Sequence, residues 1–413
     1  MKGTVRTPLP EPGTPLTEPS VDDDVAPEVA APVPQRGRPS AALAVHGLTL
    51  AAAFSVWLYL DRKLWFFGDE WDFLTRRGLH GATFSIWAPH NEHWSVLPIL
   101  LWRAIFSIAH LSAYWPYLVP LLLVHVAVVH LVWRRCLIEG VNIWVANAVA
   151  LLLALFGTGA EDLAWAFQIG FLGSTALGLL ALEVADARPG LAIGEAPGPT
   201  RLIVRRAVFD RPLLRDGLVS LLAVAALMCS DIGLAVCAAL GLVLVARSGW
   251  ARAARALAVP VGAYAIWFAL AGHSGLASTG DTLGLSVFLK IPTFVATNLE
   301  MDLGHGVGWP AARYFLFAVV IAWLVLNARN LVRRHPAALA GAIAAVTFYA
   351  LAAVGRDRIS ATMSPSRYAY VGIAFLLPSV ALMLSSLPPA LQGLRSRSWS
   401  RLRASHRRRT VLL

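Results

Sequence analysis

Charged residues and cysteines are both scarce in this chain. Only 14% of the 413 residues are charged, whereas a soluble domain normally carries about 25%. The three cysteines lie in or beside apolar runs and offer neither a disulfide framework nor the spacing of a metal site. No apolar run occurs before residue 41, so the N-terminus lacks the pattern of a signal peptide. These absences argue against a soluble enzyme and against a disulfide-stapled secreted domain.

Two sequence patterns that would indicate other functions are also missing. No glycine-rich nucleotide-binding loop is visible, and no internal repeat is long enough to suggest the inverted halves of a transporter. The net charge of +11 could suggest a nucleic-acid partner. However, the arginines lie in short loops between apolar runs, which is the orientation signal of membrane proteins. We therefore expect no nucleic-acid binding.

Long apolar runs dominate what is present, since 57% of the residues are hydrophobic. Runs of roughly 16–20 residues are long enough to cross a ~30 Å hydrocarbon core as helices. The sequence predicts an all-α, polytopic transmembrane bundle of about ten spans, with interfacial helices in its first outer loop. We expect a disordered cytoplasmic tail (1–40), a transmembrane catalytic domain (41–390) and a basic cytoplasmic tail (391–413).

The distribution of arginines predicts the orientation. Basic clusters lie at Arg134/Arg135, Arg201–Arg215, Arg247–Arg255, Arg329–Arg334 and Arg395–Arg409. The positive-inside rule places them in the cytoplasm. If the short apolar segment 96–112 lies in the interface, both termini are cytoplasmic and the loop 61–95 faces outward; if it spans, the N-terminus is outside. We expect the first arrangement, in a plasma (inner) membrane, with the site loops extracytoplasmic.

The most unusual polar stretch directly follows the first apolar run. It carries Asp69, Glu70 and Asp72 among tryptophan and phenylalanine residues, and Glu92 and His93 follow about twenty residues later. A carboxylate that is partly desolvated gains basicity, as a general base near neutral pH requires. The alternative is a solvated loop whose acids balance neighbouring basic residues. For His93, a structural hydrogen bond stands beside an acid, base or metal-ligand role.

Three further polar places are expected on the outer face. One carries Glu161, Asp162 and Gln168, and a second is the long loop from His273 to Pro310. The third carries Arg356, Arg358, Arg367 and Tyr368 and breaks the positive-inside rule. Arginine matches phosphate oxygens in a bidentate geometry, so a lipid phosphate would explain these arginines. Structural pairing with the carboxylates of the first loop is the alternative, and both can hold.

An acidic pair in the first outer loop, here Asp69-Glu70, resembles the GT-C superfamily of polytopic glycosyltransferases, which use polyprenyl-phosphate-linked sugars as donors. The resemblance implies an inverting transfer with Asp69 and Glu70 as catalytic residues. It implies that Asp72, Glu92 and His93 orient the acceptor or hold a cation.

The resemblance also implies that Arg356, Arg358, Arg367 and Tyr368 bind the donor phosphate. Glu161, Asp162 and Gln168 are secondary site candidates on the outer face. The chain lacks the large C-terminal soluble domain of better-known subfamilies, so a glycan, lipid or protein acceptor stays open. The sequence requires no cofactor, although a divalent cation such as Mg²⁺ or Mn²⁺ could take part. A surface-glycan polymerase or ligase and a transporter or flippase of lipid-linked sugar are the alternative functions.

Overall fold

The computed structural model describes residues 39–187, 211–275, 285–355 and 366–386. Contacts divide the chain into Met1–Pro39 and Ser40–Leu413, and the description below concerns the second unit. Almost all of the two expected tails lies outside the described residues, and so do Arg356 and Arg358.

The described part of the chain is helical and contains no strand, only an isolated bridge between His90 and His93. Its first half forms α1 (Pro39–Asp61), the π-helical turn η1 (Asp72–Arg76), α2 (Val96–Ala109), α3 (Trp115–Ile138), α4 (Ile143–Ala154), η2 (Gly157–Gly159), α5 (Ala160–Ala164), η3 (Ala166–Gln168) and α6 (Ile169–Asp186). The segment between α1 and α2, residues 62–95, is called the site loop.

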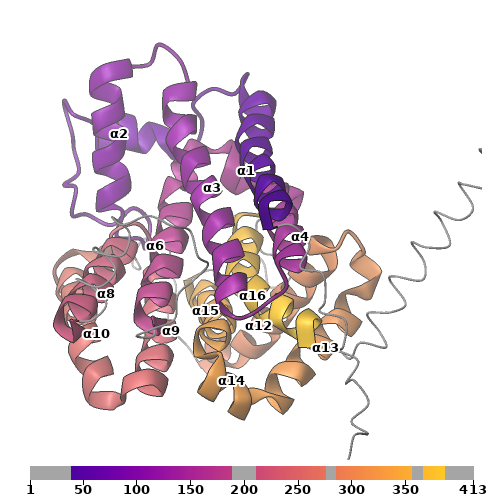
Figure 1. Cartoon of the computed structure of the whole chain (residues 1–413). Helices are drawn as coiled ribbons and strands as arrows, with labels where there is room; N and C mark the ends of the chain where they lie inside the picture. Colours follow the sequence, from indigo (N-terminus) through magenta and orange to yellow (C-terminus); the bar gives the residue numbers. More distant parts are fainter. Residues whose placement is uncertain (1–38, 188–210, 276–284, 356–365, 387–413) are drawn as a thin grey trace, which may run out of the picture. The chain divides into compact units, whose positions relative to one another are not determined.

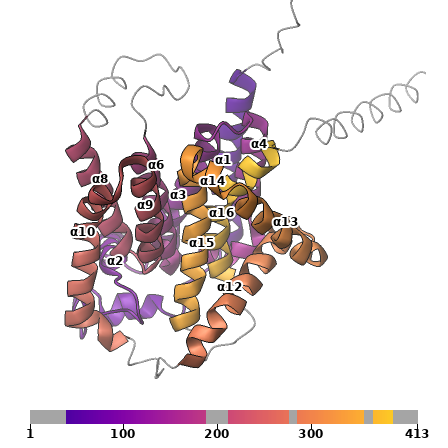
Figure 2. The same cartoon turned by 90° about the horizontal axis from the view of Figure 1, so that it is seen from below.

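The second half continues with α8 (Pro212–Leu227), α9 (Ile232–Ser248), α10 (Trp250–Trp267), η4 (Phe268–Gly272), α12 (Leu285–Gly306), η5 (Pro310–Ala312), α13 (Arg313–Leu326), α14 (Ala328–Arg334), α15 (Pro336–Gly355) and α16 (Ser366–Ser386). Figure 2 shows α6, α8, α9, α10 and α15 side by side with similar axis directions, and their mutual contacts agree.

Within the described residues, seven helices are long and apolar enough to cross a membrane, or eight if the bent pair Pro310–Leu326 and Ala328–Arg334 is one span. The expected helical, multi-pass architecture is therefore supported, whereas a total of ten spans is not established. The apolar helices α2 and α9 are shorter. With 14 residues, α2 is about 21 Å long, less than the ~30 Å of a hydrocarbon core.

The expected loop from His273 to Pro310 is wrong for most of its length, because α12 occupies residues Leu285–Gly306. Leu299 and Leu303 lie four residues apart and are buried, and the helix packs against α15 and α16. Charged residues and Pro292 are typical of a loop in the sequence, and they obscure this apolar stripe. In the structure, however, Pro292 is accommodated within the helix.

Helices α6 and α16 form the centre of the unit. In the span window of each, 72% of the residues are buried, compared with 28% in α1 and 22% in α10. Figure 1 shows α3 and α6 between α1 on one side and α8 and α10 on the other, and α16 packs against both α3 and α6. Residues at the first turns of α6 and α16 are thus fixed by packing on several sides.

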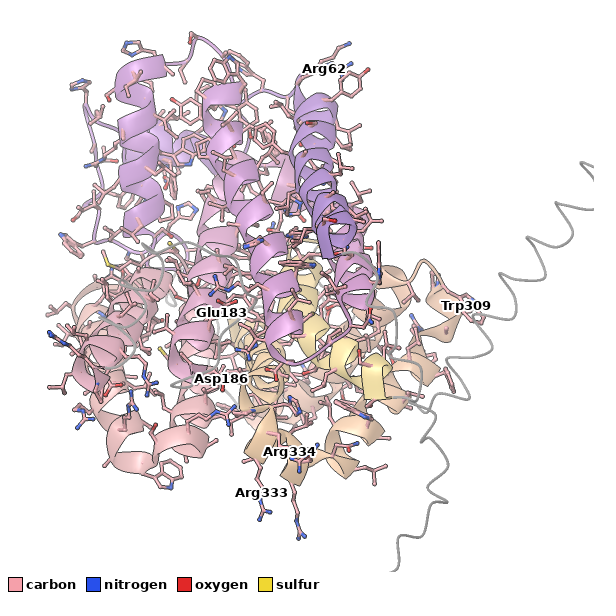
Figure 3. All side chains as sticks on the ribbon, viewed as in Figure 1. Arg62, Glu183, Asp186, Trp309, Arg333 and Arg334 are labelled. Carbon is pink, nitrogen blue, oxygen red and sulfur yellow. The ribbon has the colours of Figure 1, made fainter. Side chains whose placement is uncertain are left out.

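The unit has two chemically different ends. At the basic end, where α3, α6 and α9 finish, Asp186 pairs with Arg135 and with Arg247, each at 2.7 Å. The carbonyls of Arg333 and Arg334 accept from Arg247 at this end. Figure 3 shows Arg333 and Arg334 at the opposite end of the unit from Arg62, which follows α1. The end that carries the site loop and the starts of α3, α6 and α16 is called the site end.

Candidate functional site

The acidic stretch of the site loop begins with a tight turn at Gly68. This residue has a φ of 58°, and a Cβ on it would lie 3.1 Å from the ring of Trp165. A side chain would therefore be strained by the backbone and crowded by the indole. Asp69 and Glu70 directly follow Gly68 within this turn, and η1 begins at Asp72.

Glu70 anchors the site loop to the helical unit. Its side chain is fully buried and accepts from the Tyr114 hydroxyl at 2.7 Å and from the backbone N–H groups of Phe67 (3.0 Å) and Phe167 (3.2 Å). The Tyr114 hydroxyl in turn accepts from the Ala166 N–H at 2.8 Å. Burial raises the pKa of Glu70 to about 7, although the hydrogen bonds act in the opposite direction. These contacts fit a structural anchor better than a group that touches substrate.

A second group joins Asp72, His90 and Asp69 and is called the Asp72–His90–Asp69 group. Nδ1 of His90 lies 2.9 Å from Oδ2 of Asp72, and Nε2 lies 3.6 Å from Oδ2 of Asp69. The side chain of His90 is only 6% exposed, whereas that of Asp69 is 46% exposed. Asp69 is therefore the member of the group that a substrate can reach.

The charges of this group stabilise one another. Contact with His90 lowers the pKa of Asp69 against the effect of partial burial, and the charge of Arg367 adds to the lowering. Burial would raise the pKa of Asp72, but the contacts with His90 and Arg77 lower it to about 2. Burial would likewise lower the pKa of His90, but the two carboxylates raise it. An imidazolium between two carboxylates is therefore the favoured charge state. The gain in basicity expected from the sequence holds for Glu70 but is wrong for Asp69 and Asp72, which are weaker bases than an ordinary aspartate because His90 lies beside both.

Arg77 holds both halves of the site loop together. Its Nε donates to Asp72 at 2.8 Å, and its two terminal nitrogens donate to the carbonyls of Ala88 (2.8 Å) and Pro89 (2.7 Å). The carbonyl of Arg77 accepts from Nε of Arg103 in α2 at 2.8 Å. This network fixes the segment that carries His90 against Asp72.

Of the three arginines expected to bind the donor phosphate, Arg367 is the one within the described residues, and it lies at the start of α16. Its Nη1 lies 2.7 Å from Oε1 of Glu161, and both side chains are partly exposed. Its charge contributes to the lowered pKa of Asp69. Tyr368 is buried, and its ring stacks on Phe171 with centroids 6.2 Å apart. Arg367 and Asp69 thus belong to one electrostatic site.

Asp162 and Gln168 lie deeper than Glu161. Asp162 is fully buried, and neither of its carboxylate oxygens has a hydrogen-bond partner among the described residues. Gln168 is also buried at the start of α6. Both line the interior beneath the site end, so neither is placed for direct contact with a ligand at the surface.

Glu92 and His93 follow His90 in the site loop. His93 contacts Asp231, a carboxylate that was not among the site residues expected from the sequence. Nδ1 of His93 is 3.5 Å from Oδ2 of Asp231, which directly precedes α9. Nε2 of His93 is 3.8 Å from Oε1 of Glu92. The structure therefore brings Asp69, Asp72, Glu92, His93, Glu161 and Arg367 to the site end, while Arg356 and Arg358 lie outside the described residues.

Sequence reasoning missed three residues of the site: His90, Arg77 and Asp231. His90 stands in the same Pro-His-Asn-Glu-His segment as His93, and this position was the signal available, since its proximity to two aspartates arises only in the fold. Arg77 is one of the basic residues near the acidic stretch, for which the sequence predicts only charge balance. Asp231 lies more than one hundred residues from His93, and only the packing of α9 brings them together.

No group of three or more histidine, cysteine or acidic side chains with the geometry of a metal site occurs among residues 39–187, 211–275, 285–355 and 366–386. A divalent cation stays a prediction from the sequence. Comparison of this chain with models of known protein families, with curated proteins and with solved structures finds no match.

Proposed function

We propose that this protein is a membrane glycosyltransferase that moves a sugar from a polyprenyl-phosphate donor to an acceptor hydroxyl, with inversion at the anomeric carbon. In this proposal the chain spans the plasma membrane ten times, with the 16-residue α8 and the 17-residue α9 as short spans and α2 in the interface. The site end faces the extracytoplasmic side, and the basic end faces the cytoplasm, in accordance with the positive-inside rule.

One observation carries the proposal. Asp69 is an ionised and solvent-exposed carboxylate. It interacts with the charge of Arg367, and the buried ring of His90 contacts it. A base beside a phosphate-binding cation is what transfer from a lipid phosphate requires. The two residues are almost three hundred positions apart in sequence, so their proximity is a property of the fold.

The roles follow from the geometry. Asp69 takes the proton of the acceptor hydroxyl as its oxygen forms a bond with the anomeric carbon, and the bond from that carbon to the phosphate oxygen breaks. The electron pair of the broken bond stays on the phosphate, whose added negative charge Arg367 stabilises. Arg356 and Arg358 are proposed to assist Arg367. Tyr368 forms part of the wall beside it, and Glu70 holds the site loop without touching substrate.

Arg367 allows a direct test of the donor site. In purified protein, Arg367→Ala should raise the KM for a polyprenyl-phosphate sugar roughly tenfold or more, because a hydrogen-bonded charge pair is lost. Arg313→Ala is the matched control, since Arg313 lies at the start of α13 with a carboxylate contact of only 3.9 Å. A donor KM that is unchanged in Arg367→Ala would contradict the phosphate role.

A carrier of lipid-linked sugar is the second candidate, favoured by polar groups buried within the bundle. Asp302 is buried and hydrogen-bonded to Tyr349 at the junction of α12, α15 and α16. Buried ionisable groups in membrane bundles commonly mark transport paths. A carrier would move the intact donor between leaflets of proteoliposomes, whereas a transferase would separate the sugar from its lipid phosphate.

A further inference from the structure

A mixed polar cluster lies where the site loop meets α9 and α10. It consists of Glu92, His93, Asp231 and Tyr264, whose hydroxyl donates to Oδ1 of Asp231 at 3.4 Å. These four residues come from three separate parts of the chain. They provide two carboxylates, an imidazole and a phenol within one small volume, and this set is called the Asp231 cluster.

The Asp231 cluster adjoins the proposed catalytic carboxylate through a backbone pairing. His90 and His93 exchange N–H···O=C bonds of 3.1 and 2.9 Å, a pairing that holds Cα atoms about 5.5 Å apart and both side chains on one face. Their rings pack on Phe167 in η3 (5.1 Å) and on Phe171 in the first turn of α6 (5.5 Å). The Asp231 cluster is therefore the immediate neighbour of the Asp72–His90–Asp69 group.

The phosphate-binding cation lies on the other side of this arrangement. Phe171 contacts His93 and also stacks on Tyr368, the residue after Arg367. Asp69 is coupled to Arg367 by charge and to His93 through His90. The proposed phosphate-binding Arg367, the reacting carboxylate of Asp69 and the Asp231 cluster are thus all arranged around the first turn of α6.

Aromatic side chains border the Asp231 cluster. Trp94 stacks on Trp267 with centroids 5.3 Å apart and also contacts Tyr264. Nε1 of Trp267 donates to the carbonyl of Trp87, whose indole is 51% exposed. Trp94 is buried, and its Nε1 has no hydrogen-bond partner within the described ranges. The buried Trp94–Trp267 stack forms an apolar wall beside the Asp231 cluster, whose charged side chains stay partly exposed. Carboxylates beside an apolar wall suit a ligand that has several hydroxyl groups.

We infer that the Asp231 cluster binds the hydroxyl groups of the acceptor and that the acceptor is a sugar. The inference rests on the proposed transfer reaction. A serine side chain or a simple lipid alcohol has one hydroxyl, which Asp69 engages, and it offers Asp231 nothing further to bind. A sugar presents neighbouring hydroxyls, so one can face Asp69 while others donate to Asp231 and Glu92 and accept from His93.

The test uses the full chain in lipid nanodiscs, free of glycoside detergents. The donors are polyprenyl phosphates that carry different labelled hexoses or pentoses. The acceptors are octyl glucoside, octyl mannoside and octyl galactoside below their micellar concentrations, with octanol and N-acetylserine amide for comparison. We expect transfer to at least one octyl glycoside and to neither of the two simple alcohols.

Asp231→Asn should raise the KM for the octyl glycoside about tenfold or more, because a hydrogen bond to a charged group is lost, and leave the donor KM within twofold. Tyr264→Phe removes only a hydroxyl and should shift the same KM in the same direction. It decides the question if Asp231→Asn does not fold. Glu300→Gln, a carboxylate change on α12, should leave both constants unchanged.

The outcomes separate this inference from the proposed function. If the wild type releases no sugar from any donor, even to water, the transfer reaction itself is contradicted. If sugar is transferred but Asp231→Asn and Tyr264→Phe leave the glycoside KM unchanged, the Asp231 cluster is not the acceptor site. Transfer to octanol as readily as to glycosides, or glycoside binding that disappears with a chelator, would likewise overturn direct recognition of sugar hydroxyls.

Discussion

Nε2 of His90 lies 3.6 Å from a carboxylate oxygen of Asp69, while the opposite ring nitrogen contacts Asp72 at 2.9 Å. The buried ring therefore connects a reachable carboxylate to one that is fixed by Arg77. A histidine in this position sets both the direction and the charge environment of Asp69 without needing to touch substrate.

His90→Gln should lower kcat about tenfold or more, which corresponds to about 1.4 kcal/mol of lost positioning, with the donor KM nearly unchanged. His80→Gln is the matched control, because His80 is exposed on the same site loop. The measurement is a comparison of kcat and KM for sugar transfer. If both variants behave alike, His90 is only a packing residue.

The pH dependence of kcat should report the same histidine. The pKa of His90 is raised and those of Asp69 and Asp72 are lowered, so the imidazolium and both carboxylates coexist between these limits. The favourable charge arrangement is complete below the ordinary His pKa of 6.5 and is lost as the pH rises through the higher folded-state value. We expect kcat to decline there, and this alkaline decline should disappear in His90→Gln. An identical decline in that variant would assign it to another group.

The anchor at Tyr114 predicts a stability effect. Tyr114→Phe leaves the buried Ala166 N–H and an oxygen of Glu70 without their partner hydroxyl. The free energy of unfolding should fall by about 1–3 kcal/mol. Tyr117→Phe, which removes one bond to the carbonyl of His110, should cost only about 0.5–1.5 kcal/mol. Thermal unfolding in nanodiscs measures both, and an equal or smaller loss in Tyr114→Phe would contradict the anchor role.

Gly372 permits the close approach of α12, α15 and α16. A Cβ there would lie 2.7 Å from the Tyr349 hydroxyl and 2.8 Å from Oδ2 of Asp302. Gly372→Ala should therefore destabilise the fold by about 1–3 kcal/mol. Gly217→Ala in α8 meets no atom within 4 Å and should stabilise by about 0.5–1 kcal/mol. Thermal unfolding should show a lower unfolding temperature for Gly372→Ala and a higher one for Gly217→Ala. Destabilisation by both variants would contradict a specific packing role for Gly372.

Cysteine labelling tests the proposed orientation. The three native cysteines are buried, while Thr83 on the site loop and Arg333 in α14 are exposed. In intact cells an impermeant thiol reagent should label Thr83→Cys, whereas Arg333→Cys should react only after permeabilisation. The reverse pattern would place the site end in the cytoplasm and remove the basis for an extracytoplasmic donor.

The sequence predicted the helical membrane class and the acidic site loop because long apolar runs and clustered charges are local signals. It could not predict α12, because the buried side of this helix mixes Leu299 and Leu303 with the polar residues Asn298 and Asp302. It also could not separate the anchor Glu70 from the reachable Asp69, because adjacent acids differ only in what packs on them. The contact of Asp231 with His93 depends on helix packing, so neither segment carries a local sequence signal that predicts it.

The most direct test of the central claim is sugar transfer by wild type and Asp69→Asn in membranes supplied with labelled polyprenyl-phosphate sugars. Loss of the general base should lower kcat roughly a hundredfold or more, while Glu300→Gln and donor binding stay as in the wild type. Full activity in Asp69→Asn would contradict the account, because the carboxylate around which the site is built would then have no part in the reaction.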